Sequence, residues 1–201
     1  MSYRWPQARA AQWFASQPLA IGTNFLPSTA SNQLEMFQAA SFDETTLARE
    51  LRWMRELGFN AVRVFLHDLL WIGDRSGFLR RIDAFLSIAA MQGIGVMLVL
   101  FDGCWDPLPA LGPQPPPRPH VHNSRWVQSP GKVILNDTSR HAALREYVFG
   151  IVHHFRNDSR VLLWDIFNEA RAPTARAPSR PTPRPTPSGL RYRSNSAPPP
   201  P

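Results

Sequence analysis

The sequence is poor in cysteine, with Cys104 alone, and this excludes an internal disulfide framework. No stretch reaches the apolar length of a transmembrane helix, and residues 1–20 lack the uninterrupted apolar segment of a signal peptide. We therefore expect a cytoplasmic protein with no membrane partner. With 201 residues and 43% hydrophobic content, the chain can form one domain with a packed core.

Acidic residues are absent from residues 170–201, which contain six arginines and ten prolines. Subtracting these six charges from the net +7 leaves +1 for residues 1–169, so the body of the protein is not predicted to bind nucleic acid. The same stretch has too few apolar residues to offset its chain entropy, and we expect a disordered tail with polyproline II character. The expected organisation is therefore a folded part over 1–169 and a tail over 170–201.

Short apolar runs alternate with amphipathic segments along the folded part. The runs predict strands near residues 19–24, 60–68, 95–101 and 161–167. Apolar spacing of three and four residues predicts helices near residues 43–57, 78–92 and 144–155. The aromatic residues of 1–18 predict a short helix packed on the body. Residues 69–77 and 107–136 are expected to be loops, and loops as long as the second are usually functional.

Each predicted strand ends in polar or aromatic residues, and the last one, VLLWDIFNE, ends in Asn168 and Glu169. Because this run is nearly all apolar, we expect a strand buried on both faces, as in parallel α/β proteins. Functional groups in such proteins gather where the strands end. The fold class predicted is α/β, a partial (β/α)8 TIM barrel of about four βα units. A doubly wound sheet is the alternative, although its glycine-rich turn is missing after the first strand.

Five segments carry a family resemblance: GTNFLPSTASNQLEMFQ, NAVRVFLHDLLW, VMLVLFDGCWDPLP, HNSRWVQSPG and WDIFNE. Together they resemble the clan A glycoside hydrolases, and most of all the cellulase-like, family 5-type TIM-barrel glycosidases. The resemblance covers about residues 5–169. It implies hydrolysis of O-glycosidic bonds in β-glycans by a retaining mechanism, with an oligo- or polysaccharide as substrate and no cofactor or metal.

The resemblance also assigns roles to individual residues. Glu169 would be the general acid/base, Asn168 would bind the sugar 2-hydroxyl, and Arg63 would support the carboxylate nucleophile. A glutamate whose pKa is raised by its surroundings can protonate the leaving group of such a reaction. Five further residues fall, by position, in segments that would contact substrate: His67, Asp102, Trp105, His122 and Trp126.

The chain departs from the family pattern in its second half. A complete barrel needs eight strands and about 250 residues, and the family's nucleophile lies on the seventh strand, for which we find no counterpart. Ala170 also stands where the family has proline. We hypothesise a frameshifted or truncated gene product, which sequencing downstream of codon 169 would test. A half barrel is expected to be inactive as a monomer, and either to self-associate through its open edges or to aggregate.

Other interpretations remain open at this point. The chain could be a non-catalytic carbohydrate-binding remnant, or a proline-rich interaction module that acts through PTPRPTP in the tail. Among single residues, Arg63 could be an ordinary salt-bridge partner at a strand end, and Trp105 and Trp126 could simply pack loops. Cys104 is expected to be a half-buried thiol rather than a nucleophile.

Overall fold

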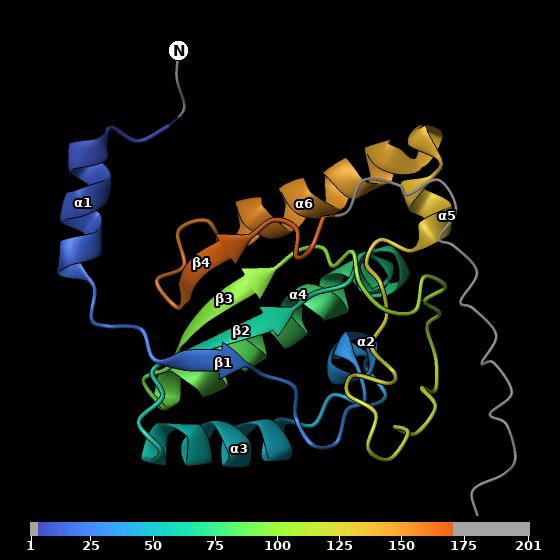
Figure 1. The fold of residues 1–201 in the computed structure, drawn as a ribbon, viewed down its shortest axis with the longest axis horizontal. Coiled ribbons are helices and arrows are strands. Elements are labelled where there is room, and N and C mark those ends of the chain that lie inside the picture. The colour runs from blue at the N-terminus through green and yellow to red at the C-terminus, as the bar shows by residue number, and fades with distance from the viewer. Residues whose placement is uncertain (1–3, 171–201) are drawn as a thin grey trace, which may run out of the picture.

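A computed structural model describes residues 4–170, so all but the first residue of the expected tail lies outside the described residues. Its centre is one parallel sheet in the order β1-β2-β3-β4 (Figure 1). The four strands are β1 (Gly22–Asn24), β2 (Ala61–Phe65), β3 (Gly95–Val99) and β4 (Val161–Asp165). The chain order of the strands is their spatial order, and the register pairs Asn24 with Arg63 and Arg63 with Met97.

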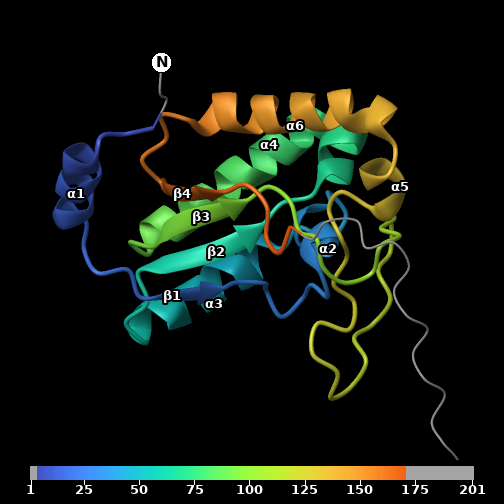
Figure 2. The same ribbon diagram turned by 45° about the horizontal axis from the view of Figure 1, so that its top comes forward.

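Helices connect successive strands, as expected of βα units. The connecting helices are α3 (Glu44–Glu56), α4 (Asp68–Met91) and α6 (His141–Phe155). Right-handed crossovers between strands that follow one another in space all fall on the same side of the sheet. Figures 1 and 2 show these helices packed together on one side, while the other side is uncovered by helices. The predicted α/β class is confirmed, and this arrangement is consistent with a partial TIM barrel.

The helix predicted near residues 43–57 is α3, and both of its ends carry local boundary signals. The side chain of Asp43 accepts a hydrogen bond from the backbone N–H of Thr46 at 3.0 Å, which caps the helix start. Glu44 in the first turn favours the positive end of the helix dipole. After the helix, Gly58 adopts φ +90°, a left-handed conformation that glycine enters without steric cost.

The expected loop at residues 69–77 is wrong, because α4 begins at Asp68. The ring of His67 accepts a hydrogen bond from the Leu69 N–H at 3.2 Å and so caps this earlier start. A kink follows at Asp74, whose φ/ψ of −155°/72° lies outside the helical region. The Asp74 carboxylate accepts from the Gly77 N–H at 2.9 Å, so a second helical segment starts about where the sequence places it.

The expected long loop at residues 107–136 also contains a short helix, α5 (Lys132–Leu135), and the 3-10 helix η1 (Thr138–Arg140) follows it. Another short helix, α2 (Gln33–Phe37), lies between β1 and α3. Its start is capped by Asn32, which accepts from the Glu35 N–H at 3.0 Å.

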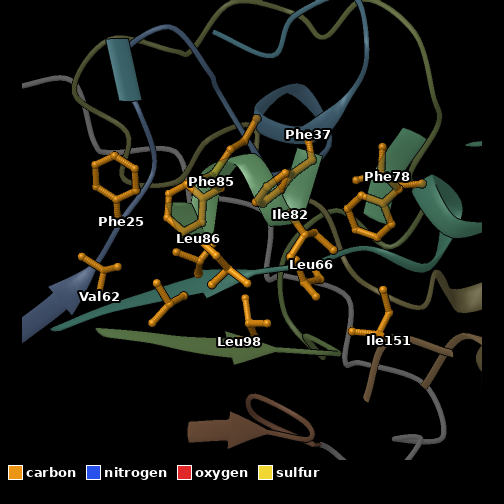
Figure 3. Packing of buried hydrophobic residues seen from close by; sticks show 14 of the residues in the cluster. Phe25, Phe37, Val62, Leu66, Phe78, Ile82, Phe85, Leu86, Leu98 and Ile151 are labelled. Carbon is orange, nitrogen blue, oxygen red and sulfur yellow. The ribbon is translucent and has the colours of Figure 1, made fainter. Parts of the chain in front are cut away.

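The hydrophobic core lies between the sheet and the helices. We call the helix side of the sheet the covered face; its strand residues Val62, Val64, Val96 and Leu98 are at most 1% exposed. In Figure 3 the rings of Phe37, Phe78 and Phe85 lie above Val62 and Leu98. Phe37 contacts Phe78 and Phe85 edge-on, and Phe85 stacks on Phe25, with centroids about 6 Å apart in each pair, a favourable geometry for aromatic side chains.

Helices α4 and α6 meet where a tryptophan lies against a glycine. A Cβ atom built on Gly150 would lie 2.0 Å from the ring of Trp71, so no larger residue fits there without movement. Trp71 is 6% exposed and contacts the ring of Tyr147 edge-on. The glycine thus allows the indole to fill the space between the two helices.

Two expectations about the periphery are wrong. Helix α1 (Gln7–Ser16) has no buried residue and lies away from the body; its Trp13 contacts the ring of Trp5 just before the helix, and its Phe14 is exposed. β4 is not buried on both faces. It is the last strand of the sheet, the helices cover only one of its sides, and Leu163 is 38% exposed.

Candidate active site

The carboxyl ends of the four strands surround a polar cavity of about 490 Å³. We call this region the mouth. Residues from every strand end and from the long loop line it, and they bring amide, guanidinium, carboxylate and aromatic groups to one place. The sequential parallel strands explain this convergence, since polar residues at the same end of each strand must meet along one edge of the sheet.

Arg63, on β2, lines the mouth. It is on the face of the sheet without helices, which we call the open face and which also presents Ala61, Met97 and Leu163. Its guanidinium donates to the carboxylate of Asp165 at the end of β4, forming an ion pair. The same group donates to Asn168 Oδ1 at 2.9 Å. Arg63 therefore fixes Asp165 and Asn168 relative to β2.

Asp102, just after β3, is the second fixed point of the mouth. It is 1% exposed, and both of its carboxylate oxygens accept hydrogen bonds. Oδ1 accepts from Asn168 Nδ2 at 3.0 Å and from the Cys104 N–H at 3.1 Å, while Oδ2 accepts from Trp126 Nε1 at 2.8 Å. A buried carboxylate with this many donors is a structural anchor that orients the neighbouring amide and indole.

Glu169 lies at the rim of the same cavity and its side chain is exposed to solvent. The thiol of Cys104 donates to Glu169 Oε2 at 2.8 Å. Glu169 adopts φ +48°, and Trp105 and Asn123, which also line the cavity, have φ values of +76° and +48°. Left-handed backbone at residues other than glycine costs free energy and is concentrated at functional sites.

Aromatic side chains form one wall. Trp105 is 44% exposed, and its ring lies edge-on to the ring of His122 with centroids 5.8 Å apart. Trp126 is buried and contacts Phe65 edge-on at 5.2 Å. The first pair thus offers accessible ring surface to a ligand, whereas the Trp126 ring is buried and offers little.

Buried hydrogen bonds attach the loop segment that carries Trp126 to the start of α4. The ring of His67 hydrogen-bonds the Gln128 carbonyl through Nε2 at 3.1 Å, and Ser129 Oγ donates to Asp68 Oδ1 at 2.9 Å. On the other side, the backbone of Ser129 pairs with that of Asp102. His67, Asp68 and Ser129 are fully buried or nearly so, and they act as a clamp on this segment.

The structure therefore brings seven of the eight residues singled out in the sequence to the cavity: Arg63, Asp102, Trp105, His122, Trp126, Asn168 and Glu169. His67 is not among them. It was expected in a segment that contacts substrate, but its ring is 0% exposed because it caps α4 and holds the loop.

Sequence reasoning missed Asp165, Asn24 and Asn123. Asp165 is the ion-pair partner of Arg63, and Asn24 Oδ1 lies 3.4 Å from Arg63 Nη1. Strand alternation could have found Asp165, since it is two residues after Leu163 and so shares its face of the sheet. The position of Asn123 depends on loop conformation and carries no periodic signal.

Within residues 4–170, no group of three or more His, Cys, Asp or Glu side chains is arranged to hold a metal ion. In the same part of the chain, no helix combines the length and the apolar character needed to cross a membrane.

No protein-family model matches the sequence. A search of curated proteins finds no match either. Among solved structures, the chain is similar to the endo-1,4-beta-mannanase from Rhizomucor miehei, with 21% identity and a TM-score of 0.46. The match covers 70% of this chain and 43% of the mannanase chain, so the chain spans less than half the length of that enzyme.

Proposed function

We propose that the mouth is a glycoside hydrolase-like site that binds a β-linked oligo- or polysaccharide, with Glu169 as its general acid/base. The observation that carries the proposal is the position of Glu169: an exposed carboxyl group at the rim of a polar cavity, beside a fixed network of Asn168, Arg63 and Asp102.

The chemistry of the lining supports a sugar ligand. A pyranose presents hydroxyl groups around its edge and apolar C–H faces, so it needs hydrogen-bonding groups next to aromatic surface. Trp105 supplies the accessible aromatic surface, and Asn168 supplies an amide whose orientation is fixed by Arg63 and Asp102. Glu169 is then the group that protonates the glycosidic oxygen, because its carboxyl group is exposed to solvent and also lines the cavity.

A single copy is proposed to bind without efficient cleavage. Glycosidic hydrolysis uses two carboxyl groups on opposite sides of the scissile bond. Of the residues that line the cavity, Asp102 and Glu169 carry carboxyl groups, and Asp102 is buried with both oxygens engaged. Asp102 is therefore a poor nucleophile or base, and the described part of one chain presents one working acid.

Binding is tested by isothermal titration calorimetry with cellohexaose, mannohexaose and xylohexaose. We expect at least one of them to bind, and Trp105→Ala to weaken it about tenfold or more through loss of the aromatic surface. Trp53→Ala is the matched control, because Trp53 is a tryptophan of α3 with 49% exposure outside the cavity. Equal effects of the two substitutions, or no binding of any of the three sugars, would contradict the proposed site.

Cleavage is tested with aryl β-glycosides, whose good leaving group reduces the demand for acid catalysis. At low protein concentration we expect turnover at background level for the unmodified chain and for Glu169→Gln alike. Glu56→Gln, an exposed glutamate of α3, is the control. If one copy turned over the substrate and Glu169→Gln abolished this activity, the proposed deficiency of a single copy would be wrong, and the acid/base role would be supported.

A further inference from the structure

We propose that a second copy of this chain covers the open face of the sheet, and that two four-stranded sheets close into one eight-stranded barrel with a shared mouth. This inference rests on the sheet and its edges rather than on the sugar chemistry proposed above.

Both edges of the sheet are available for pairing. β1 pairs only with β2, and β4 only with β3, within residues 4–170. On β4, the Asp165 carbonyl accepts from the Leu100 N–H at 2.9 Å, so the backbone groups of its neighbour Trp164 point to the outer side. Edges of this kind, with free donors and acceptors, are templates for another strand.

The open face is apolar enough to require a cover. Parallel sheets are almost always buried on both faces. Here Ala61, Met97 and Leu163 lie around a hollow of about 300 Å³ on the open face, and Leu163 is 38% exposed. Next to the start of β1, Leu19 and Ile21 are 80% and 50% exposed.

A second copy would supply the strands that closure needs. A closed (β/α)8 barrel has eight parallel strands with its helices outside. Residues 4–170 of one copy contain four parallel strands in sequential order, with α3, α4 and α6 between them. Two copies therefore bring together the eight strands of such a barrel.

Two copies fit one another by symmetry. A twofold axis parallel to the strands keeps all strands pointing the same way, so β4 of each copy meets β1 of the other in the parallel sense used within the sheet. The same β4–β1 contact forms twice, once at each edge, so the ring of strands closes and no open-ended filament results. Eight strands is the number at which side chains just fill a barrel interior, and α3, α4 and α6 would all remain outside.

Closure would also change the functional site. The four strand ends of each copy would face one mouth, so a Glu169 from each copy would line the same cavity. Two exposed carboxyl groups would then be present where one copy has a single one. The assembled barrel, rather than the single chain, would hold the pair of acids that glycosidic cleavage uses.

The test is sedimentation equilibrium of the full chain across a wide concentration range. We expect a monomer–dimer equilibrium, with the mass rising from 22.7 kDa to twice that value. Leu163→Lys would place a charge inside the closed barrel and should raise the dimer dissociation constant about 100-fold or more. Phe149→Lys, on α6 with 69% exposure, is the matched control and should change it less than about twofold. Far-UV circular dichroism checks that both variants fold.

Three results would overturn the proposal. They are a monomer at every concentration, assembly that continues beyond the dimer, and a dimer weakened equally by the two substitutions or only by Phe149→Lys. Because the experiment measures mass and contains no sugar, it can fail while the calorimetry succeeds, and the reverse also holds.

Discussion

The two faces of the sheet are built from the same strands but differ in what they contain. On the covered face, β2 and β3 present Val62, Val64, Val96 and Leu98, which are buried under helices. On the open face, the alternate residues include Arg63, Met97 and Asp165, which are half-buried. Neighbouring residues in a strand thus serve different purposes: one set stabilises the fold, and the other lines the mouth or faces the hollow on the open face.

The strongest test of this difference uses two adjacent residues of β3. Leu98→Ala, on the covered face, should destabilise the protein by about 3–4 kcal/mol, because it removes buried atoms and leaves a cavity. Met97→Ala, on the open face, should cost about 1 kcal/mol or less, since Met97 is only half-buried. Urea unfolding at low protein concentration gives both values. Similar losses would mean that the open face is as well packed as the covered one.

The mouth lies on the open face, yet Asp102 within it is as deeply buried as the strand residues of the covered face. Asp102→Ala should cost about 2–3 kcal/mol, since it leaves the donors of Trp126, Asn168 and Cys104 without their acceptor. The exposed Asp106, whose carboxylate accepts from the Leu108 N–H, is the control, and Asp106→Ala should cost less than about 1 kcal/mol. Near-UV circular dichroism should show the indole of Trp126 losing its fixed environment in the first variant only.

The smallest effect tests the depth of burial on the covered side through pH. The Tyr147 hydroxyl is fully buried and donates to the Leu100 carbonyl at 3.0 Å, so Tyr147→Phe should cost about 1 kcal/mol at pH 7. Burial, with a smaller contribution from Asp68, raises the pKa of Tyr147 well above its ordinary value of 10. The folded protein therefore holds this proton more tightly than the unfolded chain does.

The sign of the pH effect follows from this shift. The stabilisation is complete below pH 10 and is lost as the pH rises from about 10 towards the raised pKa, because the unfolded chain releases its proton first. The stability difference between the natural chain and Tyr147→Phe should therefore shrink above pH 10. Tyr3 and Tyr192 are present in both proteins and cancel. A difference that stays constant to pH 12 would show that water reaches the hydroxyl.

Local sequence signals were sufficient where each signal acts within a few residues. The Asp43 cap and Gly58 define α3, and the apolar runs of β2 and β3 predict strands that the structure contains. Most of the candidate site could also be predicted from the residues at the strand ends, because parallel strands in sequential order bring these ends to one edge of the sheet.

Signals failed where the outcome depends on distant residues. Leu69 to Gly77 look like a loop because of their glycines and charges, yet the His67 cap and the fit of Trp71 against Gly150, 79 positions away (150 − 71), make the first part helical. An apolar run such as VLLWD predicts burial, but whether both faces are covered depends on what lies beyond the edge of the sheet. The burial of His67 likewise depends on the loop carbonyl of Gln128.

The clamp beneath Trp126 has a consequence for kinetics. Since His67, Asp68 and Asp102 hold residues 128–129 from two sides, this wall of the mouth is in place before any ligand arrives. Entry of a ligand past this wall needs no closing flap, so association should follow one exponential phase whose rate rises linearly with ligand concentration. This wall therefore behaves as a fixed surface, and selectivity among ligands would then depend on their shape at first encounter.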